Sequence, residues 1–338
     1  MILVVSATDD MHTQAVQEAL TRRGIGAKLL DLSDFPQAMT VAMQYGDSER
    51  VELTVAGEER IRLSECRAVW WRRPQPFQID AVVTNPAHRA FAYTESVEAF
   101  AGLWKMFDAV WVNDPTCDEV AARKPYQLRI ARELGLTIPR TLVTNDPREA
   151  EDFIESLAPN PVVYKAFSAT EQTWRETRIL ARGEEALLKS VRYAPLIFQE
   201  YVPLELDLRV TVVGERIFAT AIHSKDSSYE VDCRMDLANA TVKSFQLPDE
   251  IEHAVSCLMR ALGLIYGAID MRMTPAGQFV FLEINPAGQW LFAELRSGQR
   301  ITDALASLLG ALDEGGRQAG SVPAGPGGSR HRVADPVA

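Results

Sequence analysis

Three oxygen-bearing side chains in the last third of the chain are spaced as metal ligands would be. Glu283 and Asn285 fall in the apolar run Phe279-Val-Phe-Leu-Glu-Ile-Asn285, and strand side chains repeat with a period of two, so both lie on one face. Asp270 belongs to the preceding apolar segment, which a short turn joins to this one. Oxygen ligands without His or Cys suit Mg²⁺, which takes one or two protein carboxylates and fills its shell with water and nucleotide phosphate. The spacing therefore predicts a magnesium site that serves ATP.

The competing interpretation is that these acids are ordinary solvated residues at strand ends. Asp270 taken alone would favour that interpretation. Glu283 and Asn285 differ because they interrupt an apolar run, where a carboxylate and an amide cost free energy unless they have a partner. The metal site is the favoured interpretation.

Residues upstream of the metal ligands follow the order that a nucleotide site needs. Two lysines, one near a predicted helix start and one at the end of an apolar strand, can bring an ammonium group to phosphate oxygens. An extended segment further on offers backbone groups to adenine, and a glutamate after it suits ribose hydroxyls. Each feature alone also has an ordinary structural explanation. The predicted nucleotide-binding residues are Lys124, Lys165, Gln199, Glu200, Tyr201, Val202 and Glu205.

Composition limits the class of protein. At 338 residues with 47% hydrophobic content, the chain is long enough for two or three domains with real cores. A net charge of −11 argues against nucleic acid as a partner. The four cysteines are scattered, which favours neither a zinc site nor a disulfide framework. No segment is long and apolar enough for a membrane span, and the first residues are typical of a strand, so we expect a cytoplasmic enzyme.

Residues 1–115 are expected to form an N-terminal α/β domain. A strand, a helix and a second strand form a βα unit of a parallel sheet, and a hairpin and a further strand follow. Arg72 and Arg73 follow that last strand, where a solvated strand end is the favoured interpretation. The expected strands are 2–5, 27–32, 50–55, 60–63 and 68–71, with a helix at 11–23 and a closing helix whose apolar positions are Phe91, Val97, Phe100, Leu103, Trp104 and Phe107.

Two further domains and a tail are expected beyond residue 115. Residues 116–194 form a central domain, and residues 195–312 form a strand-rich C-terminal domain that carries the metal ligands. Residues 313–338 are rich in Gly, Pro and Ala and predict a disordered tail. The expected helices are 118–134, 184–191 and 250–262, and the expected strands include 161–165, 177–181, 196–202, 206–213 and 216–223.

Taken together, these residues resemble the ATP-grasp superfamily, and most closely its microviridin-type (graspetide) ribosomal-peptide maturases. The resemblance covers Met1 to about Leu312. The ending Glu283-x-Asn285-Pro286 is shared by the whole superfamily, including its glutamate ligases. The segments that carry the resemblance are Ala68-Val-Trp-Trp-Arg-Arg-Pro74, Lys124-Pro-Tyr-Gln-Leu128, Val163-Tyr-Lys165, Phe198-Gln-Glu-Tyr-Val202, Asp207-Leu-Arg209, His223-Ser224, Val231-Asp-Cys-Arg234 and the block from Asp270 to Gln289.

The resemblance implies a fold, a reaction and partners. The fold would be α/β: an ATP-grasp fold with a parallel-sheet pre-ATP-grasp domain, a central domain and a C-terminal antiparallel-sheet domain. The enzyme would use ATP and two Mg²⁺ ions to phosphorylate an Asp or Glu side chain of a precursor peptide. It would then close an ester with Thr or Ser, or an amide with Lys. The partner would be a peptide whose leader docks on the central domain, near residues 173–192, and a homodimer is possible.

The resemblance also implies roles for four further residues. Arg209 and Arg272 would neutralise the transferring phosphoryl group, and Asp232 and Arg234 would handle the core peptide, although an exposed ion pair is an equally good interpretation of the latter two. The loop after Lys165 departs from the family because residues 166–174 contain no glycine. The hydroxyls of Ser168 and Thr170 are the candidate substitutes.

Two alternatives remain open at this point. One is an ATP-grasp ligase that joins free amino acids or extends a peptide terminus, and the other is a non-catalytic nucleotide-binding regulator. The intact set of lysines and metal ligands counts against the regulator. The type of bond (ester or amide), the number of rings and the leader also stay open. His223 is a candidate general base because a histidine can titrate near neutral pH, but a structural role in its strand is the favoured interpretation.

Overall fold

The computed structural model describes residues 1–46, 50–55, 59–167, 177–180, 184–223 and 240–315. Several predicted features lie outside these ranges, namely Ser168, Thr170, Asp232, Arg234, residues 173–176 and 181–183 of the predicted leader-docking region, and residues 316–338 of the predicted tail.

The chain forms two compact units, which are described separately. Unit 1 contains Met1–Cys117, Arg260–Ile265 and the residues from Ala306 onward, and unit 2 contains Asp118–Met259 and Tyr266–Leu305. The predicted domain boundaries at residues 115, 194 and 312 remain predictions. Among the helices in the described ranges, none combines the length and the apolar character that crossing a bilayer requires.

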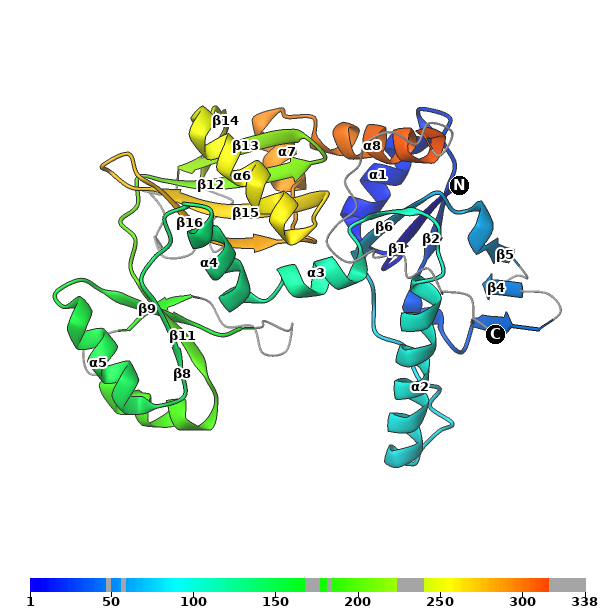
Figure 1. Cartoon of the computed structure of the whole chain (residues 1–338), viewed down its shortest axis with the longest axis horizontal. Helices are drawn as coiled ribbons and strands as arrows, with labels where there is room; N and C mark the ends of the chain where they lie inside the picture. Colours follow the sequence, from blue (N-terminus) through cyan, green and yellow to red (C-terminus); the bar gives the residue numbers. More distant parts are fainter. Residues whose placement is uncertain (47–49, 56–58, 168–176, 181–183, 224–239, 316–338) are drawn as a thin grey trace, which may run out of the picture. The chain divides into compact units, whose positions relative to one another are not determined.

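The core of unit 1 is a four-stranded parallel sheet. Its strands are β1 (Ile2–Ser6), β2 (Ala27–Leu30), β6 (Ala68–Arg73) and β7 (Val110–Val112), in the order β2-β1-β6-β7. β1 is buried along its whole length, as expected for a central strand covered on both faces. The helices α1 (Met11–Thr21) and α2 (Pro86–Trp104) follow β1 and β6 (Figure 1). The predicted N-terminal parallel sheet is confirmed.

A second sheet of unit 1 was only partly predicted. It contains β3 (Met39–Gln44), β4 (Arg50–Val55) and β5 (Glu59–Arg62), which pair antiparallel in that order, and short 3₁₀ turns η1 (Leu32–Asp34) and η2 (Leu63–Glu65) flank it. The sequence predicted the β4–β5 hairpin but not β3. Of the apolar positions named for the closing helix, Phe100, Leu103, Trp104 and Phe107 are buried, along α2 and just after it. Phe91 and Val97 are instead 67% and 38% exposed.

The first sheet of unit 2 is a four-stranded antiparallel sheet. Its strands are β8 (Thr141–Thr144), β9 (Val162–Lys165), β10 (Arg178–Ile179) and β11 (Leu196–Glu200), in the order β10-β9-β11-β8. The helix α5 (Pro147–Leu157) lies beside this sheet (Figure 1), and the 3₁₀ helix η3 runs from Glu185 to Tyr193. Leu157 of α5 and Leu188 and Val191 of η3 belong to one buried cluster with Val162 and Phe198 of the sheet. The helix predicted at 184–191 is present as a 3₁₀ helix.

The second sheet of unit 2 is five-stranded and antiparallel, and it carries the predicted metal ligands. Its strands are β12 (Leu206–Val213), β13 (Arg216–His223), β14 (Thr241–Phe245), β15 (Tyr266–Met273) and β16 (Phe279–Asn285), in the order β14-β13-β12-β15-β16. The helix α6 (Asp249–Leu262) was predicted, whereas α7 (Leu291–Ser297) and α8 (Ile301–Gly315) were not. Because α8 ends at Gly315, the first residues of the predicted tail are helical.

The single helix predicted at 118–134 is wrong, because the structure has two helices there. These are α3 (Pro115–Ala121) and α4 (Lys124–Glu133), separated by Arg123 in an extended conformation with ψ of 101°. Pro125 explains the break, since inside a continuous helix it has no N–H for the carbonyl of Ala121 and its ring would clash there. The side chain of Gln127 donates to that carbonyl instead, over 2.6 Å. The break leaves Lys124 in the first turn of α4.

Candidate active site

The strands β15 and β16 bring the predicted metal ligands together. Asp270 lies directly opposite Glu283, and Ala268 lies opposite Asn285. The register shifts just after Asp270, so that Leu282 is an extra residue on β16. Such a bulge bends a strand and redirects its side chains, and bulges are common beside active sites. The alternation predicted from the sequence thus holds at Glu283 and Asn285 but is broken one residue before them.

Both predicted phosphate-binding lysines lie at the carboxylate of Glu283. The ammonium of Lys124, in α4, donates to Oε2 of Glu283 and forms an ion pair with it. The ammonium of Lys165, at the end of β9, lies 4.0 Å from the same oxygen. The three side chains are 14% to 23% exposed, so solvent screens this cluster only partly. Two cations on one carboxylate leave a positive excess, which suits the phosphates of a nucleotide.

The predicted arginines lie on the neighbouring strands as two matched ion pairs. In the register of β12 and β15, Arg209 is opposite Asp270 and Asp207 is opposite Arg272. Nε of Arg209 lies 3.1 Å from Oδ1 of Asp270, and Nε of Arg272 donates to Oδ1 of Asp207 over 2.8 Å. Arg209 therefore shares a carboxylate with the predicted metal site. Arg272 is buried.

The predicted adenine-binding segment is held by side-chain and main-chain hydrogen bonds. Nε2 of the buried Gln199 donates to Oγ1 of Thr141 over 2.9 Å, and Oε1 of Glu200 accepts from the peptide N–H of Arg140 over 3.0 Å. Nη1 of Arg272 donates to the carbonyl of Val202 over 3.0 Å. These contacts fix the end of β11.

The remaining members of that segment join the two sheets of unit 2. The peptide N–H of Tyr201 donates to the carbonyl of Pro161, and that of Glu205 donates to the carbonyl of Met273, each over 2.9 Å. The guanidinium of Arg272 lies 5.8 Å above the ring of Tyr201. The segment from Gln199 to Glu205 is thus anchored to β15 at two points.

A tight turn follows the last predicted metal ligand. Oδ1 of Asn285 accepts from the peptide N–H of Ala287 over 2.9 Å, and the carbonyl of Gly288 accepts from the hydroxyl of Tyr266 over 2.8 Å. A Cβ at Gly288 would lie 2.3 Å from the Cβ of Ala268, the residue opposite Asn285. Only glycine allows this approach, which places the turn against β15.

The donor set fits a magnesium–nucleotide complex. Asp270, Glu283 and Asn285 offer oxygen alone, and cations flank the two acids. In the described part of the chain, His, Cys, Asp and Glu side chains form no group of three or more that could hold a metal. Mg²⁺ itself relies on few protein carboxylates and completes its shell with water and phosphate.

A buried ionic cluster at the end of β6 was missed by sequence reasoning. Arg72, expected at a solvated strand end, is 1% exposed, and its Nε lies 3.6 Å from Oδ1 of Asp10. Burial, followed by the positive charge of Arg72, lowers the pKa of His12 to about 4. For Asp10 burial alone would raise the pKa, but Arg72 and the hydrogen bond from Thr13 outweigh it and leave that pKa below its usual value. The available signal was the position of Arg72 at the carboxyl end of a parallel strand, where binding residues gather.

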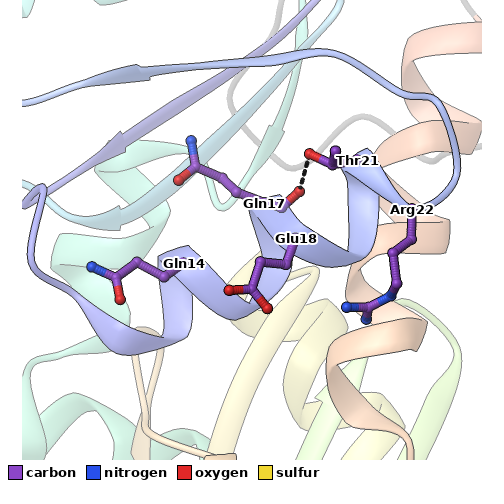
Figure 2. Close-up of a pocket in the computed structure, with 5 residues that line it drawn as sticks. All are labelled: Gln14, Gln17, Glu18, Thr21 and Arg22. Atoms are coloured by element: carbon purple, nitrogen blue, oxygen red, sulfur yellow. Dashed lines mark hydrogen bonds between the residues drawn. The ribbon is translucent and has the colours of Figure 1, made fainter.

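A surface depression of about 520 Å³ lies along α1 of unit 1. Figure 2 shows its five lining side chains along the helix, with the hydroxyl of Thr21 donating to the carbonyl of Gln17. None of the predicted site residues in the described ranges lines this depression. The lining residues are Gln14, Gln17, Glu18, Thr21 and Arg22.

Comparison with protein families accounts for nearly the whole chain. Residues 1–119 match the MvdD pre-ATP grasp domain, and residues 117–309 match the RimK-like ATP-grasp domain. The chain therefore belongs to the RimK-like ATP-grasp family, and the predicted ATP-grasp fold is confirmed.

Curated relatives and solved structures refine this assignment. A probable alpha-L-glutamate ligase of Xanthomonas campestris pv. campestris (strain B100) is 26% identical over 188 residues, which cover 54% of this chain and 64% of the relative. This chain thus spans less than two thirds of that relative. The macrocyclase MdnC of Microcystis aeruginosa MRC, solved with the precursor peptide MdnA, is 29% identical with a TM-score of 0.81, covering 91% of this chain and 98% of MdnC. A RiPP-associated ATP-grasp ligase of Chryseobacterium gregarium, solved with ADP and leader and core peptides, is 26% identical with a TM-score of 0.82, covering 91% and 96%.

Proposed function

We propose that this protein is an ATP-dependent ligase that activates carboxylates of a ribosomally made peptide and closes macrocycles in it. The observation that carries the proposal is the convergence of Lys124 and Lys165 on Glu283, which faces Asp270. These side chains come from α4, β9, β15 and β16, so only the folded unit 2 assembles them. A site with two ammonium groups beside two acids can hold both the phosphates of ATP and the metal that accompanies them.

Each predicted nucleotide-binding residue has a role in this proposal. The ammonium groups of Lys124 and Lys165 would move from Glu283 to phosphate oxygens. The peptide groups of Glu200 and Val202 would frame adenine, with Gln199 and Tyr201 fixing that segment, and Glu205 would bind ribose. The carbonyl of Val202 accepts from Arg272, which leaves the peptide N–H of Val202 as the group proposed for adenine.

Asp270, Glu283 and Asn285 would hold Mg²⁺. When bound, the metal would offset the negative charge that phosphate oxygens develop during transfer. Glu283 would exchange its lysine partners for the metal, so that its charge stays compensated throughout. Two ions are proposed, as the family resemblance implies.

The reaction would proceed through an acyl phosphate. A carboxylate oxygen of the peptide attacks the γ-phosphorus of ATP, and the bond to the β,γ-bridging oxygen breaks, giving ADP. A Thr or Ser hydroxyl, or a Lys amine, then attacks the acyl carbon, and phosphate leaves with the former carboxylate oxygen. Arg209, which already lies 3.1 Å from Asp270, is placed to steady the transferring group, whereas Arg272 would hold the adenine segment as well.

The peptide substrate is proposed from the relatives together with the N-terminal region. The MvdD pre-ATP grasp match covers residues 1–119, and MdnC and the Chryseobacterium gregarium ligase were each solved with peptides. Those structures are 29% and 26% identical to this chain. We propose a microviridin-type precursor with a leader as the partner. The second candidate is the transfer of free amino acids, which the resemblance to alpha-L-glutamate ligases favours.

The test is the intact mass of the product. The purified protein is incubated with ATP, Mg²⁺ and the short peptide encoded beside its gene, and in parallel with free glutamate and a peptide acceptor. Loss of the mass of one or more waters from the precursor, dependent on ATP, supports a macrocyclase. A gain of glutamate residues supports the amino-acid ligase and contradicts macrocyclisation. The matched variant Glu283→Ala should be inactive in either case while remaining folded.

A further inference from the structure

The strand that carries two of the predicted metal ligands lies at the edge of its sheet. In the described part of unit 2, β15 is the one strand that pairs with β16 along its length. The outer peptide groups of an edge strand have no ladder partner, and proteins often cover such an edge with a helix or a loop. At the first half of β16 this cover is the peptide of Thr137, whose carbonyl accepts from the N–H of Phe281 over 2.8 Å.

At the second half of β16 the cover is one side chain. Oε1 of Gln127 accepts from the peptide N–H of Ile284 over 3.1 Å, and Nε2 of Gln127 donates to the carbonyl of Ile284 over 2.7 Å. A side-chain amide has the same donor and acceptor as a peptide group. The side chain of Gln127 therefore makes the two hydrogen bonds with Ile284 that a residue of a neighbouring strand would make. Its side chain is 2% exposed, so water does not compete for these bonds.

The contact falls between the two predicted ligands. Ile284 is buried and separates Glu283 from Asn285. Fixing both peptide groups of Ile284 therefore fixes the direction of the side chains on either side of it. A slip of one residue would turn both ligands to the opposite face of the sheet. The bulge at Leu282 makes this part of β16 the place where the pairing with β15 specifies the register least.

The same residue also ties the site to the helix that carries Lys124. Gln127 follows Lys124 by one turn of α4. Its Nε2 also donates to the carbonyl of Ala121, to which Pro125 cannot donate because proline has no backbone N–H. Gln127, in α4, thus binds both the end of α3 and β16 through one amide, close to the place where Lys124 meets Glu283.

We infer that Gln127 is a positioning residue that sets the register of β16, and with it the direction of Glu283 and Asn285 and their distance from Lys124. This inference rests on the proposed function, because the metal site is itself a proposal. Gln127 touches neither nucleotide nor metal in this account and acts through the backbone of Ile284. Partners in the outer shell of metal sites typically change metal affinity by about 10- to 100-fold when they are lost.

The test uses two substitutions and a control in the full chain. Gln127→Met keeps the volume and removes both hydrogen bonds, and Gln127→Asn keeps the amide but is too short to reach both Ile284 groups. Thr302→Val is the matched control, because it removes another buried side-chain hydrogen bond of unit 2, from Nε1 of Trp290 over 2.9 Å. Two quantities are measured for each: the hydrogen-exchange rate of the Ile284 amide, and the affinity for ADP as a function of Mg²⁺ concentration.

The expected result is faster exchange of the Ile284 amide, by about tenfold, in both Gln127 variants. The Mg²⁺ concentration that gives half-maximal ADP binding should rise by about tenfold or more, whereas ADP binding without Mg²⁺ changes little. Thr302→Val should alter neither quantity. Should Gln127→Met fail to fold, Gln127→Asn decides the question.

The positioning role would be overturned if the Gln127 variants kept the wild-type Mg²⁺ dependence of ADP binding. It would also be overturned if Thr302→Val raised the Mg²⁺ concentration for half-maximal binding by the same factor. If wild-type protein itself binds ADP without any effect of Mg²⁺, the proposed metal site fails instead. In that case the exchange rate alone still reports whether Gln127 holds β16.

Discussion

The buried histidine of unit 1 predicts an acid-sensitive fold. His12 lies beside Arg72 and near Arg73 and Asp10, and burial is the largest reason that its pKa is about 4 rather than 6.5. In the unfolded chain His12 takes up a proton as the pH falls below 6.5, while in the folded protein it stays neutral. The unfolded state therefore binds more protons, and stability is lost as the pH falls from 6.5 toward 4.

The size of the effect follows from the two pKa values. Once the pH lies below both, His12 contributes a loss of about 3 kcal/mol, since each tenfold difference in proton affinity is worth about 1.4 kcal/mol. Between about pH 7 and about pH 5 the loss from His12 alone is about 2 kcal/mol. Asp10, whose pKa is lowered from 3.8, adds to the acid sensitivity only at still lower pH.

The assay is urea unfolding followed by tryptophan fluorescence at a series of pH values. Trp70, Trp71, Trp104 and Trp111 all lie in unit 1 and report on its unfolding. His12→Gln should remove about 2 kcal/mol of the difference between pH 7 and pH 5. His88→Gln is the control, because His88 is exposed on α2 of the same unit. An unchanged pH dependence in His12→Gln would contradict this prediction, since it would mean that His12 binds protons alike in the folded and unfolded states.

Two further substitutions test the packing around the candidate active site. Gly288→Ala would place a Cβ 2.3 Å from that of Ala268. It should cost about 1–3 kcal/mol in urea unfolding and weaken Mg²⁺-dependent ADP binding, while Gly102→Ala, at an α2 position with nothing within 4 Å, should not destabilise the protein. Equal stability of Gly288→Ala and wild type would contradict the close approach. Arg272→Met removes the hydrogen-bonded ion pair that Arg272 forms with the buried Asp207 and should cost about 3–5 kcal/mol, with weaker ADP binding even without Mg²⁺. A stable Arg272→Met protein with unchanged ADP affinity would show that Arg272 does not hold the adenine segment.

The sequence predicted those features of the fold that depend on neighbouring residues. Period-two alternation placed Glu283 and Asn285 on one face of a strand adjacent to that of Asp270, and the turn between the strands followed from local composition. Apolar runs between turn residues likewise predicted the parallel sheet of unit 1 and most strands of unit 2.

The features that were missed depend on contacts between distant residues. Gln127 has nothing in its local sequence that predicts a bond to Ile284, which is 157 positions away. The local sequence around Arg72 does not differ from that of a solvent-exposed arginine at a strand end. Only the tertiary fold shows that Arg72 is buried beside Asp10. The bulge at Leu282 arises from pairing with β15 and has no signal in β16 alone.

The break between α3 and α4 was missed for a different reason. Its signal, Pro125, was present in the sequence. The helix was nevertheless predicted to run through it, from 118 to 134. The rule that proline interrupts the interior of a helix would have found the break.

Whether ATP phosphorylates a peptide carboxylate can be measured with an oxygen label. The precursor peptide is prepared with ¹⁸O in its Asp and Glu side-chain carboxylates and is incubated with the protein, ATP and Mg²⁺. The released phosphate is then analysed by mass spectrometry. Our account predicts one ¹⁸O atom in each phosphate released per ring closed, because the carboxylate oxygen that attacked the γ-phosphorus leaves with it. Unlabelled phosphate, or label found in AMP, would contradict the acyl-phosphate mechanism.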